Sequence, residues 1–483
     1  MTLSDCTRDT TTTGAGGAGI GLITKTFNNG VALTTDFDWF DLITSSAVSE
    51  VLGGLNASEK RTTCASTASP VNRATGDFYH QFDDLSIPGR GISLHFARTY
   101  NALASAQTGR LGYGWTDSYN LFLTADSAGD IVVTQVVTQE DGSTVPFFAV
   151  HGVYQAPPRV LATLVANGDG TLTFTRKNQQ KFTFLAPATG AVGPLLSESD
   201  RNGYTTSLTY TTPLTNDLVS KITDPSGRSL AFGYDGANHI KTVSDSIGRT
   251  VAFTYNAAGE LTDAQDVRGY TTHFTYTTAN NMHLLQTMTD PNNGTVSNVY
   301  DGAGRVLSQT DAMNRTTAFT YTAPDATQVS TTTITDPRGY VTVEQYQDFE
   351  LRSLTKGYGA AQQATWTYSY DPATRGIASE TDPNGHTSSN TWDANGNLLS
   401  HTDPLGHRTS YAYDGLNDTT AITDAMNVVT TNTYDANGNL LSVSRPVTPT
   451  RTGTISTVHS TGYISFTISP GSGLPNSGIS VIL

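Results

Sequence analysis

The sequence has 483 residues and a formal net charge of −15, with 37% hydrophobic and 14% charged side chains. The acidic balance argues against a nucleic-acid partner, because an acidic surface repels phosphate backbones. No apolar run approaches the roughly 18 residues of a membrane-spanning helix, so no membrane span is expected. The 45 glycines, 22 tyrosines and 18 phenylalanines favour tight turns and strands. The composition therefore predicts an all-β protein.

Residues 1–68 form the first segment, and their sequence predicts little regular secondary structure. They are rich in Gly and Thr, which predicts a loosely ordered chain, although 36–52 have the pattern of a short amphipathic helix. The segment lacks the basic and apolar stretches of a signal peptide. Its GxGxxG match at 14–19 has no strand–turn–helix context, so we expect a linker and no cofactor. Cys6 and Cys64 are too few for a disulfide scaffold, and whether they pair stays open.

Residues 69–195 predict an irregular β domain that precedes a repeat. Stretches such as VPFFAV and LTFTRKNQQKFTFL read as strands, and Gly-rich phrases such as GRLGYGW separate them. These strands show no fixed spacing. We therefore treat them as a separate pre-repeat unit.

A repeat fills residues 196–445. The stretches WDANGNLLS (392–400) and YDANGNLLS (434–442) start 42 residues apart, and another YD lies halfway between them, at Tyr413. Most steps between such aromatic residues are 21 residues, and a second phrase of DPxG type recurs with the same spacing. About eleven repeats of this length indicate one supersecondary unit stacked many times.

Each repeat is expected to be one antiparallel β-hairpin. After the D-P-S-G turn at 224–227, Leu230, Phe232 and Tyr234 alternate with small residues. A second turn begins at Asp235 and a second alternating stretch follows it. Because alternate residues of a strand share a face, the aromatic side chains should form one ladder on the protected face of a coiled sheet.

The repeat motif supplies the candidate site residues, and their predicted role is structural. They are the Asp and Gly of the DPxG turns and the aromatic–Asp pairs at the ends of strands. The predicted set is Asp224, Gly227, Tyr234, Asp235, Asp245, Gly248, Tyr255, Asp266, Gly269, Tyr276, Tyr300, Asp301, Asp311, Tyr321, Asp382, Gly385, Trp392, Asp393, Asp403, Gly406, Tyr413, Asp414, Tyr434 and Asp435.

The repeated Asp residues are interpreted as turn caps, because an Asp side chain accepts hydrogen bonds from its own turn. A basic residue four positions later, as at Arg228, Arg249 and Arg315, is placed to neutralise the carboxylate. Equivalent positions of adjacent repeats lie two strands apart, about 9–10 Å, which is too far for a shared proton or for a zinc site. The same spacing argues against a metal held by His386 and His407. No catalytic, cofactor-binding or metal-binding residue is therefore predicted.

Residues 446–483 follow the array without its phrases. No Asp, Glu, Lys or Arg comes after Arg451, and the segment is expected to be disordered or to mark a truncated chain. The last hairpin, Tyr434–Ser444, would then have no following partner. We therefore expect an open, C-shaped ribbon with an exposed last edge and an empty concave side.

The phrases YDANGNLL and TDPxGxxTxxxYD resemble those of the Rhs/YD-repeat family. The block that contains Pro70–Tyr79, Ile87–Gly89, Arg98–Asn101 and Gly112–Trp115 resembles the domain that precedes the repeats in that family, so the resemblance covers about 70–444. It implies a β-ribbon that coils into a hollow shell. In the toxin members, the shell encloses a C-terminal toxin that is released by cleavage at a core motif. Here the DPxG phrase at 403–406 departs from that core motif, and the resemblance implies a shell segment.

The resemblance also implies a secreted or cell-surface protein without enzymatic activity. Its expected role is to wrap or present a cargo, such as a toxin or an adhesive domain, with a secretion apparatus as a further partner. The alternative is a carbohydrate- or cell-surface-binding module, because exposed Tyr and Thr ladders can stack on sugars and hydrogen-bond to them.

Overall fold

The computed structural model describes residues 71–126, 134–138, 144–150, 152–156, 160–187, 191–211, 218–325 and 327–446. The expectations for residues 1–68, for Cys6 and Cys64, and for residues 447–483 lie outside these ranges. Within them, no helix has the length and apolarity needed to cross a membrane.

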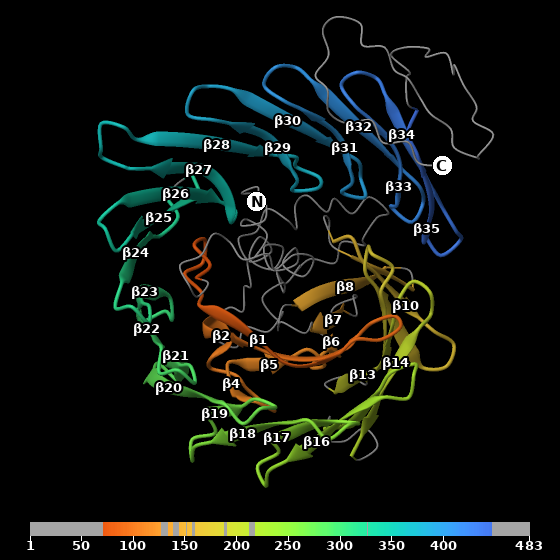
Figure 1. Cartoon of the computed structure of the whole chain (residues 1–483), viewed down its shortest axis with the longest axis vertical. Helices are drawn as coiled ribbons and strands as arrows, with labels where there is room; N and C mark the ends of the chain where they lie inside the picture. Colours follow the sequence, from red (N-terminus) through yellow and green to blue (C-terminus); the bar gives the residue numbers. More distant parts are fainter. Residues whose placement is uncertain are drawn as a thin grey trace, which may run out of the picture.

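The chain forms a ring of antiparallel strands around a smaller inner module (Figure 1). The inner module, residues 71–121, has a three-stranded sheet in the order β1–β2–β5 and a separate β3–β4 hairpin. Its elements are β1 (Tyr79–Ile87), β2 (Leu94–Asn101), a 3-10 helix (Ala102–Ala104), β3 (Thr108–Gly109), β4 (Gly112–Tyr113) and β5 (Trp115–Asp117).

One sheet of 30 strands runs from β6 to β35. Strands β10 to β35 make the ring, and β6, β7 and β8 lie inside it beside the inner module (Figure 1). Strands β6 to β9 pair in sequence, strands β10 to β35 do the same, and the pairing of β6 with β13 joins the two runs. The first strands are β6 (Phe122–Asp126), β7 (Thr134–Thr138), β8 (Thr144–Val150), β9 (Val153–Gln155), β10 (Thr163–Ala166), β11 (Thr171–Thr175), β12 (Lys181–Leu185) and β13 (Val192–Ser199). The sheet continues through β13, so the expected boundary at 195–196 falls inside a strand.

From β14 onward the strands follow the repeat, two to each repeat. They are β14 (Thr205–Tyr210), β15 (Val219–Thr223), β16 (Ser229–Tyr234), β17 (Ile240–Asp245), β18 (Thr250–Tyr255), β19 (Leu261–Gln265), β20 (Thr271–Ala279), β21 (Met282–Thr289), β22 (Thr295–Tyr300), β23 (Val306–Thr310), β24 (Thr316–Thr322), β25 (Val329–Thr335), β26 (Val341–Gln347), β27 (Glu350–Lys356), β28 (Ala364–Tyr370), β29 (Ile377–Thr381), β30 (Thr387–Trp392), β31 (Leu398–Thr402), β32 (Arg408–Tyr413), β33 (Thr419–Thr423), β34 (Val429–Tyr434) and β35 (Leu440–Ser444). The expectation of an all-β fold with a coiled antiparallel ribbon is confirmed.

The turns of successive hairpins alternate between the two edges of the ribbon and form two rims. The DPxG rim carries the turns 176–180, 200–204, 224–228, 245–249, 266–270, 290–294, 311–315, 336–340, 382–386, 403–407 and 424–428. The YD rim carries the turns that follow the aromatic residues, at 235–239, 256–260, 301–305, 325–329, 371–376, 393–397, 414–418 and 435–439.

A β-bulge at the aromatic residue of most repeats explains why the ribbon curves. The strand register shifts between Gly233 and Tyr234 and again between Thr254 and Tyr255. The same shift recurs at Tyr210, Tyr276, Tyr300, Tyr346, Tyr370, Trp392, Tyr413 and Tyr434. A bulge bends its strand and increases the local twist, so repeated bulges at one position coil the sheet.

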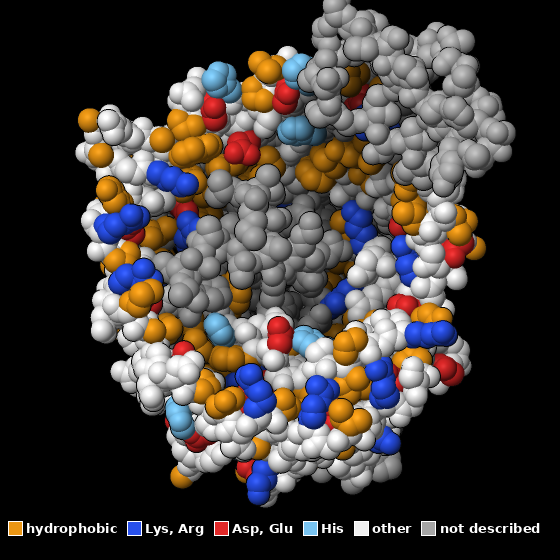
Figure 2. All heavy atoms as spheres, in the orientation of Figure 1, with side chains coloured by type: hydrophobic (Ala, Val, Ile, Leu, Met, Phe, Trp, Pro, Cys, Tyr) orange, Lys and Arg blue, Asp and Glu red, His pale blue; other side chains and the backbone are white. Residues whose placement is uncertain are grey.

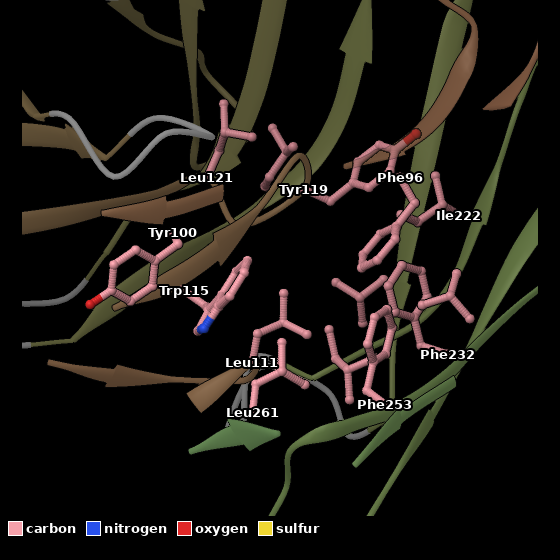
Figure 3. Close-up of a cluster of buried hydrophobic side chains, with 14 of the residues drawn as sticks. Phe96, Tyr100, Leu111, Trp115, Tyr119, Leu121, Ile222, Phe232, Phe253 and Leu261 are labelled. Atoms are coloured by element: carbon pink, nitrogen blue, oxygen red, sulfur yellow. The ribbon is translucent and has the colours of Figure 1, made fainter. Parts of the chain in front are cut away.

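The main core lies between the inner module and the concave face of the ribbon. Phe96 of β2 meets Phe232 edge to face at 5.7 Å and Phe253 at 6.0 Å, measured between ring centroids. Figure 3 shows these rings together, with Leu111 and Trp115 of the inner module beside Leu261 of the ribbon. Phe253 is only 4% exposed, which confirms that the aromatic ladder faces the protected side in this part of the ribbon.

The expectation of an open ribbon with an empty concave side is wrong on both counts. The inner module occupies the concave side of β14–β24, where the largest cluster of buried apolar residues lies. The ring also closes, because Arg201 beside β14 forms an ion pair with Asp418 beside β33, 217 residues further along the chain. The sequence pattern specifies the hairpin but not how much each bulge bends the ribbon, and that bend brings the two ends together.

Candidate functional site

The Asp residues of the repeat cap their own turns. The Oδ1 atom of Asp224 accepts hydrogen bonds from the backbone N–H groups of Ser226 at 2.9 Å and Arg228 at 2.8 Å. The same pair of bonds, to residues two and four positions on, recurs at Asp200, Asp235, Asp245, Asp266, Asp290, Asp301, Asp311, Asp325, Asp336, Asp382, Asp403, Asp414, Asp424 and Asp435. Asp393 makes the second bond of the pair, to Asn397.

The turns also require a left-handed residue at their fourth position. Gly227, Gly248, Gly269, Gly385 and Gly406 have φ values between 83° and 91°. At equivalent turn positions, Asn replaces Gly with φ values of 66°, 57° and 60° at Asn293, Asn314 and Asn427. Gly and Asn tolerate this region best, so these glycines serve the turn and not a bound ligand.

Side chains four positions after the Asp complete many turns. Arg228, Arg249 and Arg315 form ion pairs with Asp224, Asp245 and Asp311, at N–O distances of 2.6 Å. The hydrogen bond from the Arg315 guanidinium holds the pKa of Asp311 below its ordinary value of 3.8.

On the DPxG rim, two histidines take the place of this arginine, as His239 does on the YD rim. His386 and His407 contact Asp382 and Asp403 at 3.0 and 2.8 Å on the DPxG rim. His401 lies on β31 and contacts Asn390. Each of these histidines therefore serves its own turn or strand pair. Among the described residues, no group of three or more His, Cys, Asp or Glu side chains is arranged to hold a metal ion.

We expect the protein to lose stability in acid through these turns. The pKa is lowered at Asp224, Asp235, Asp245, Asp266, Asp311, Asp325, Asp336, Asp382, Asp403, Asp424 and Asp435. In the unfolded chain these groups titrate near 3.8, so their stabilisation is complete above that pH and disappears as the pH falls through the lower folded-state values. Calorimetry should show Tm roughly constant from pH 7 to about 5 and falling below about 4. A Tm that stays constant down to pH 2 would contradict this role.

The tyrosine hydroxyls make a second repeated contact, which sequence reasoning missed. The Tyr255 hydroxyl donates to the carbonyl oxygen of Ile240, 15 residues earlier, at 2.7 Å. The same contact across 15 residues recurs at Tyr210, Tyr234, Tyr276, Tyr300, Tyr321, Tyr413 and Tyr434, and the Trp392 indole N–H makes it at 3.0 Å. Burial raises the pKa of Tyr234 to about 12, so its hydroxyl keeps the proton that it donates. The sequence does contain a pattern that indicates this contact: an aliphatic residue lies 15 positions before most of these tyrosines.

Removal of one such hydroxyl should destabilise the ribbon measurably. We expect Tyr255→Phe to cost about 1–3 kcal/mol, because the fully buried Ile240 loses the donor to its carbonyl oxygen. Urea unfolding would measure the loss. The control is Tyr270→Phe on the DPxG rim, where the side chain is 55% exposed and the change should be within about 0.5 kcal/mol. Equal effects of the two substitutions would contradict the assigned contact.

The inner module is held to the ribbon by hydrogen bonds at the YD rim. The backbone N–H groups of Ile240, His283 and Val306, which follow YD-rim turns, donate to the carbonyl oxygens of Arg110, Ser105 and Gly76. Each donor lies at the start of a strand that follows a bulged aromatic residue. The inner module therefore binds backbone groups at the bulged ends of these three hairpins.

Side chains add further contacts between the inner module and the ribbon. The Tyr100 hydroxyl donates to the carbonyl oxygen of His283 at 3.0 Å, and the Trp115 indole N–H donates to the Tyr276 hydroxyl at 2.8 Å. Arg98, 2% exposed, pairs with Asp84 at 2.7 Å and lies 4.2 to 5.5 Å from four aromatic rings of both units. Nothing in the local pattern around Arg98 distinguished it from a surface arginine.

The predicted site residues thus line the two rims and the concave face, and they do not converge on one point. The DPxG residues and the Asp of each YD pair lie in the turns, while the aromatic partners lie on the concave face beside the bulges. The Asp side chains contact their own turns, and Figure 2 shows acidic and basic side chains distributed around the ring. The aromatic hydroxyls contact the adjacent hairpin, and Tyr276 also accepts a hydrogen bond from Trp115 of the inner module. The arrangement builds and curves a wall, and the enclosed concave face is the candidate functional surface.

Comparisons with known proteins agree with this organisation. The model of the RHS repeat matches residues 234–269, 300–341, 392–425 and 413–450. A model described as a domain of unknown function (DUF6531) matches residues 68–147, which include the inner module. No curated protein matches the sequence.

Among solved structures, the chain has a low-scoring similarity to a TcdB2-TccC3-TEV structure and to a Tc holotoxin pore. A crystal structure of TcdB2-TccC3-TEV shares 13% identity at a TM-score of 0.38, covering 65% of this chain and 19% of that one. A structure of the Photorhabdus luminescens Tc holotoxin pore shares 9% identity at a TM-score of 0.33, covering 76% of this chain and 26% of that one. The chain therefore spans about a fifth to a quarter of the length of these structures.

The fold and its contacts define a class of protein: an all-β ribbon of hairpin repeats that closes around the inner module. The family-model matches identify the repeat: the ribbon of this chain carries RHS repeats, and a DUF6531 domain that includes the inner module precedes them.

Proposed function

We propose that the chain is a non-enzymatic wall that encloses a polypeptide cargo on its concave side. One observation carries the proposal: the inner-face position two residues before the aromatic changes character along the ribbon. Where the inner module covers the ribbon, it is Leu or Phe at 208, 232, 253, 274 and 319, with one Asn at 298. Further along, it is Glu, Tyr, Asn, Tyr and Asn at 344, 368, 390, 411 and 432. The first half of the wall is therefore built for a permanent apolar contact and the second half for a weaker, polar one.

Two repeats in the second half of the wall have inner-face polar groups that already make hydrogen bonds within the ribbon. The Asn390 amide and the Trp392 indole both donate to the carbonyl oxygen of Ile377, at 2.9 and 3.0 Å. Asn432 and Tyr434 converge in the same way on the carbonyl oxygen of Thr419, both at 2.8 Å. Donors that already bond within the ribbon do not bind an enclosed chain, so these two repeats would hold it only weakly.

The family resemblance suggests the kind of cargo and its location. A toxin or adhesive domain is the expected cargo, a secretion apparatus is a further partner, and the protein is expected to be secreted or at the cell surface. No enzymatic role is proposed, because the repeated Asp carboxylates and the side chains of His386 and His407 are engaged in their own turns.

The aromatic ladder gives no support to the carbohydrate-binding alternative. Its Phe rings are buried in β16–β24, and its Tyr hydroxyls donate to backbone carbonyls. The exposed rings lie elsewhere, on the DPxG rim, as at Tyr270 and Tyr340. Binding of any glycan at micromolar strength would favour this alternative.

Protection of a defined cargo tests the proposal. A trypsin-sensitive reporter polypeptide fused to the end of the full chain should be cut more slowly than the free reporter. A photo-crosslinker at Asn432, on the inner face, should capture the reporter, whereas one at the neighbouring outward position, Thr433, should not. A reporter cut at the free rate, or captured equally from both positions, would refute the enclosure.

A further inference from the structure

The ring closes through a contact that differs from every strand pair in the sheet. Consecutive strands of the ribbon are joined by ladders of backbone hydrogen bonds, but the two ends of the ribbon meet through their turns. The DPxG-rim turns 176–180 and 200–204 meet the YD-rim turns 393–397, 414–418 and 435–439. We call this contact the seam. It lies where β10 and β14 approach β33 and β35 in Figure 1.

The seam is polar and centred on one arginine. The Arg201 guanidinium makes a two-pronged contact with the Asp418 carboxylate at 3.0 and 2.7 Å, and it also donates to the carbonyl oxygen of Gly438 at 2.9 Å. Asn202 and Asn439 exchange two amide hydrogen bonds at 3.1 and 2.6 Å. Lys177 donates to the carbonyl oxygen of Gly396 at 3.0 Å. Arg201 and Asp418 are 25% and 16% exposed, so water reaches the pair.

Charge placement separates the seam turns from the rest of the DPxG rim. The second turn position carries a cation at Lys177 and Arg201, and it carries Pro, Ser, Val or Ala in every later turn of this rim defined above. Both cations donate to the carbonyl oxygen of a glycine at the fourth position of a YD-rim turn. This pairing of a cation with a glycine carbonyl makes the closure specific to the two ends of the ribbon.

The hairpins that close the ring have little core of their own in the described residues. The last buried apolar residue along the described chain is Ile377, and all five residues of β35 are exposed. Strands β30–β35 are therefore held by pairing along the ribbon and by the seam. Breaking the seam leaves the sheet ladders intact.

We propose that the seam is the opening of the shell: hairpins β30–β35 swing away from β11–β14 as a unit when its charged contacts are lost. The opening gives access to the concave side without unpairing any strand. Because the central contact is a water-accessible ion pair, closure weakens as ionic strength rises. Closure through the seam does not depend on what the shell encloses.

A distance measurement across the seam tests the proposal. The full chain carries Cys6→Ser and Cys64→Ser, and spin labels are attached at Ser207→Cys on β14 and Ser442→Cys on β35. In pulsed EPR, the closed ring should give one short-distance peak. Arg201→Asp should lose this peak, and the exchanged pair Arg201→Asp with Asp418→Arg should regain it. Raising the salt concentration to 1 M should weaken the peak in the unsubstituted seam.

Two matched controls keep the test specific. Arg268→Met removes an arginine of the same rim that pairs only with its own turn, at Asp266, and it should leave the peak unchanged. Gly438→Ala should lose the peak, because a Cβ there would collide with Arg201 and Asp418, whereas Gly406→Ala strains an equivalent turn in open space and should keep it.

Two outcomes would overturn the proposal. One is a peak that survives Arg201→Asp with the β-sheet circular dichroism intact, because the ring would then be closed by something else. The other is a loss of the sheet signal in Arg201→Asp and in the exchanged pair alike, because the seam would then be part of the folding core and not an opening.

Discussion

Phe253→Ala is expected to destabilise the protein by about 3–5 kcal/mol, one of the two largest effects of any single change considered for this chain. Phe253 is 4% exposed and lies between the ribbon and the inner module. Its ring contacts Phe96 at a centroid distance of 6.0 Å, and the Arg98 guanidinium lies 5.5 Å from its centroid. Truncation leaves a cavity at the junction of two rigid sheets, which cannot collapse to fill it.

The neighbouring residue supplies the control for this prediction. Thr254 is on the same strand but points to the exposed convex face, so Thr254→Ala should change the free energy of unfolding by less than about 0.5 kcal/mol. Urea unfolding of both variants measures the difference. A loss under about 0.5 kcal/mol for Phe253→Ala would place the aromatic ladder in solvent and contradict the assigned concave face.

Arg98→Met should lower the free energy of unfolding by a similar amount, about 3–5 kcal/mol, because it leaves the buried Asp84 carboxylate without a cation. Arg98 donates to Asp84 at 2.7 Å, and the two side chains are 2% and 13% exposed. The guanidinium also lies 4.2 Å from the centroid of Phe82, on the inner module, and 5.2 Å from that of Phe274, on the ribbon. Methionine fills much of the space but provides no charge for Asp84.

The pH dependence of this variant distinguishes a stranded charge from a simple packing defect. Burial raises the pKa of Asp84, and the nearby Arg98 opposes that rise. Without the arginine the folded-state pKa should rise further, so the cost of the variant should be largest at neutral pH and should shrink as the pH falls toward the ordinary Asp value. Adding Asp84→Asn should recover much of the loss, and Arg268→Met at an exposed pair should cost under about 1 kcal/mol. A cost that is the same at pH 4 and pH 7 would contradict the assigned role.

The local structure of the array followed from the sequence because each repeat encodes it with short-range chemistry. An Asp at the first turn position, a Gly or Asn at the fourth and alternating apolar residues between the turns specify a hairpin without help from distant residues. Asp224 and Asp235 cap their turns by contacts that span four residues. Repetition of one such unit also predicts the antiparallel ribbon and the shared face of its aromatic residues.

Only the tertiary structure decided how the ribbon curves and what fills it. The bulges at Tyr234 and Tyr255 depend on pairing with the following strand, and the bend they produce accumulates over the whole array before Arg201 reaches Asp418. A contact between residues 217 positions apart cannot be predicted from a repeat of 21 residues. The placement of the inner module depends in the same way on Arg98, Tyr100 and Trp115 meeting partners in distant repeats. Hydrogen bonding within a turn is therefore readable from sequence, whereas closure and enclosure result from geometry summed over many repeats.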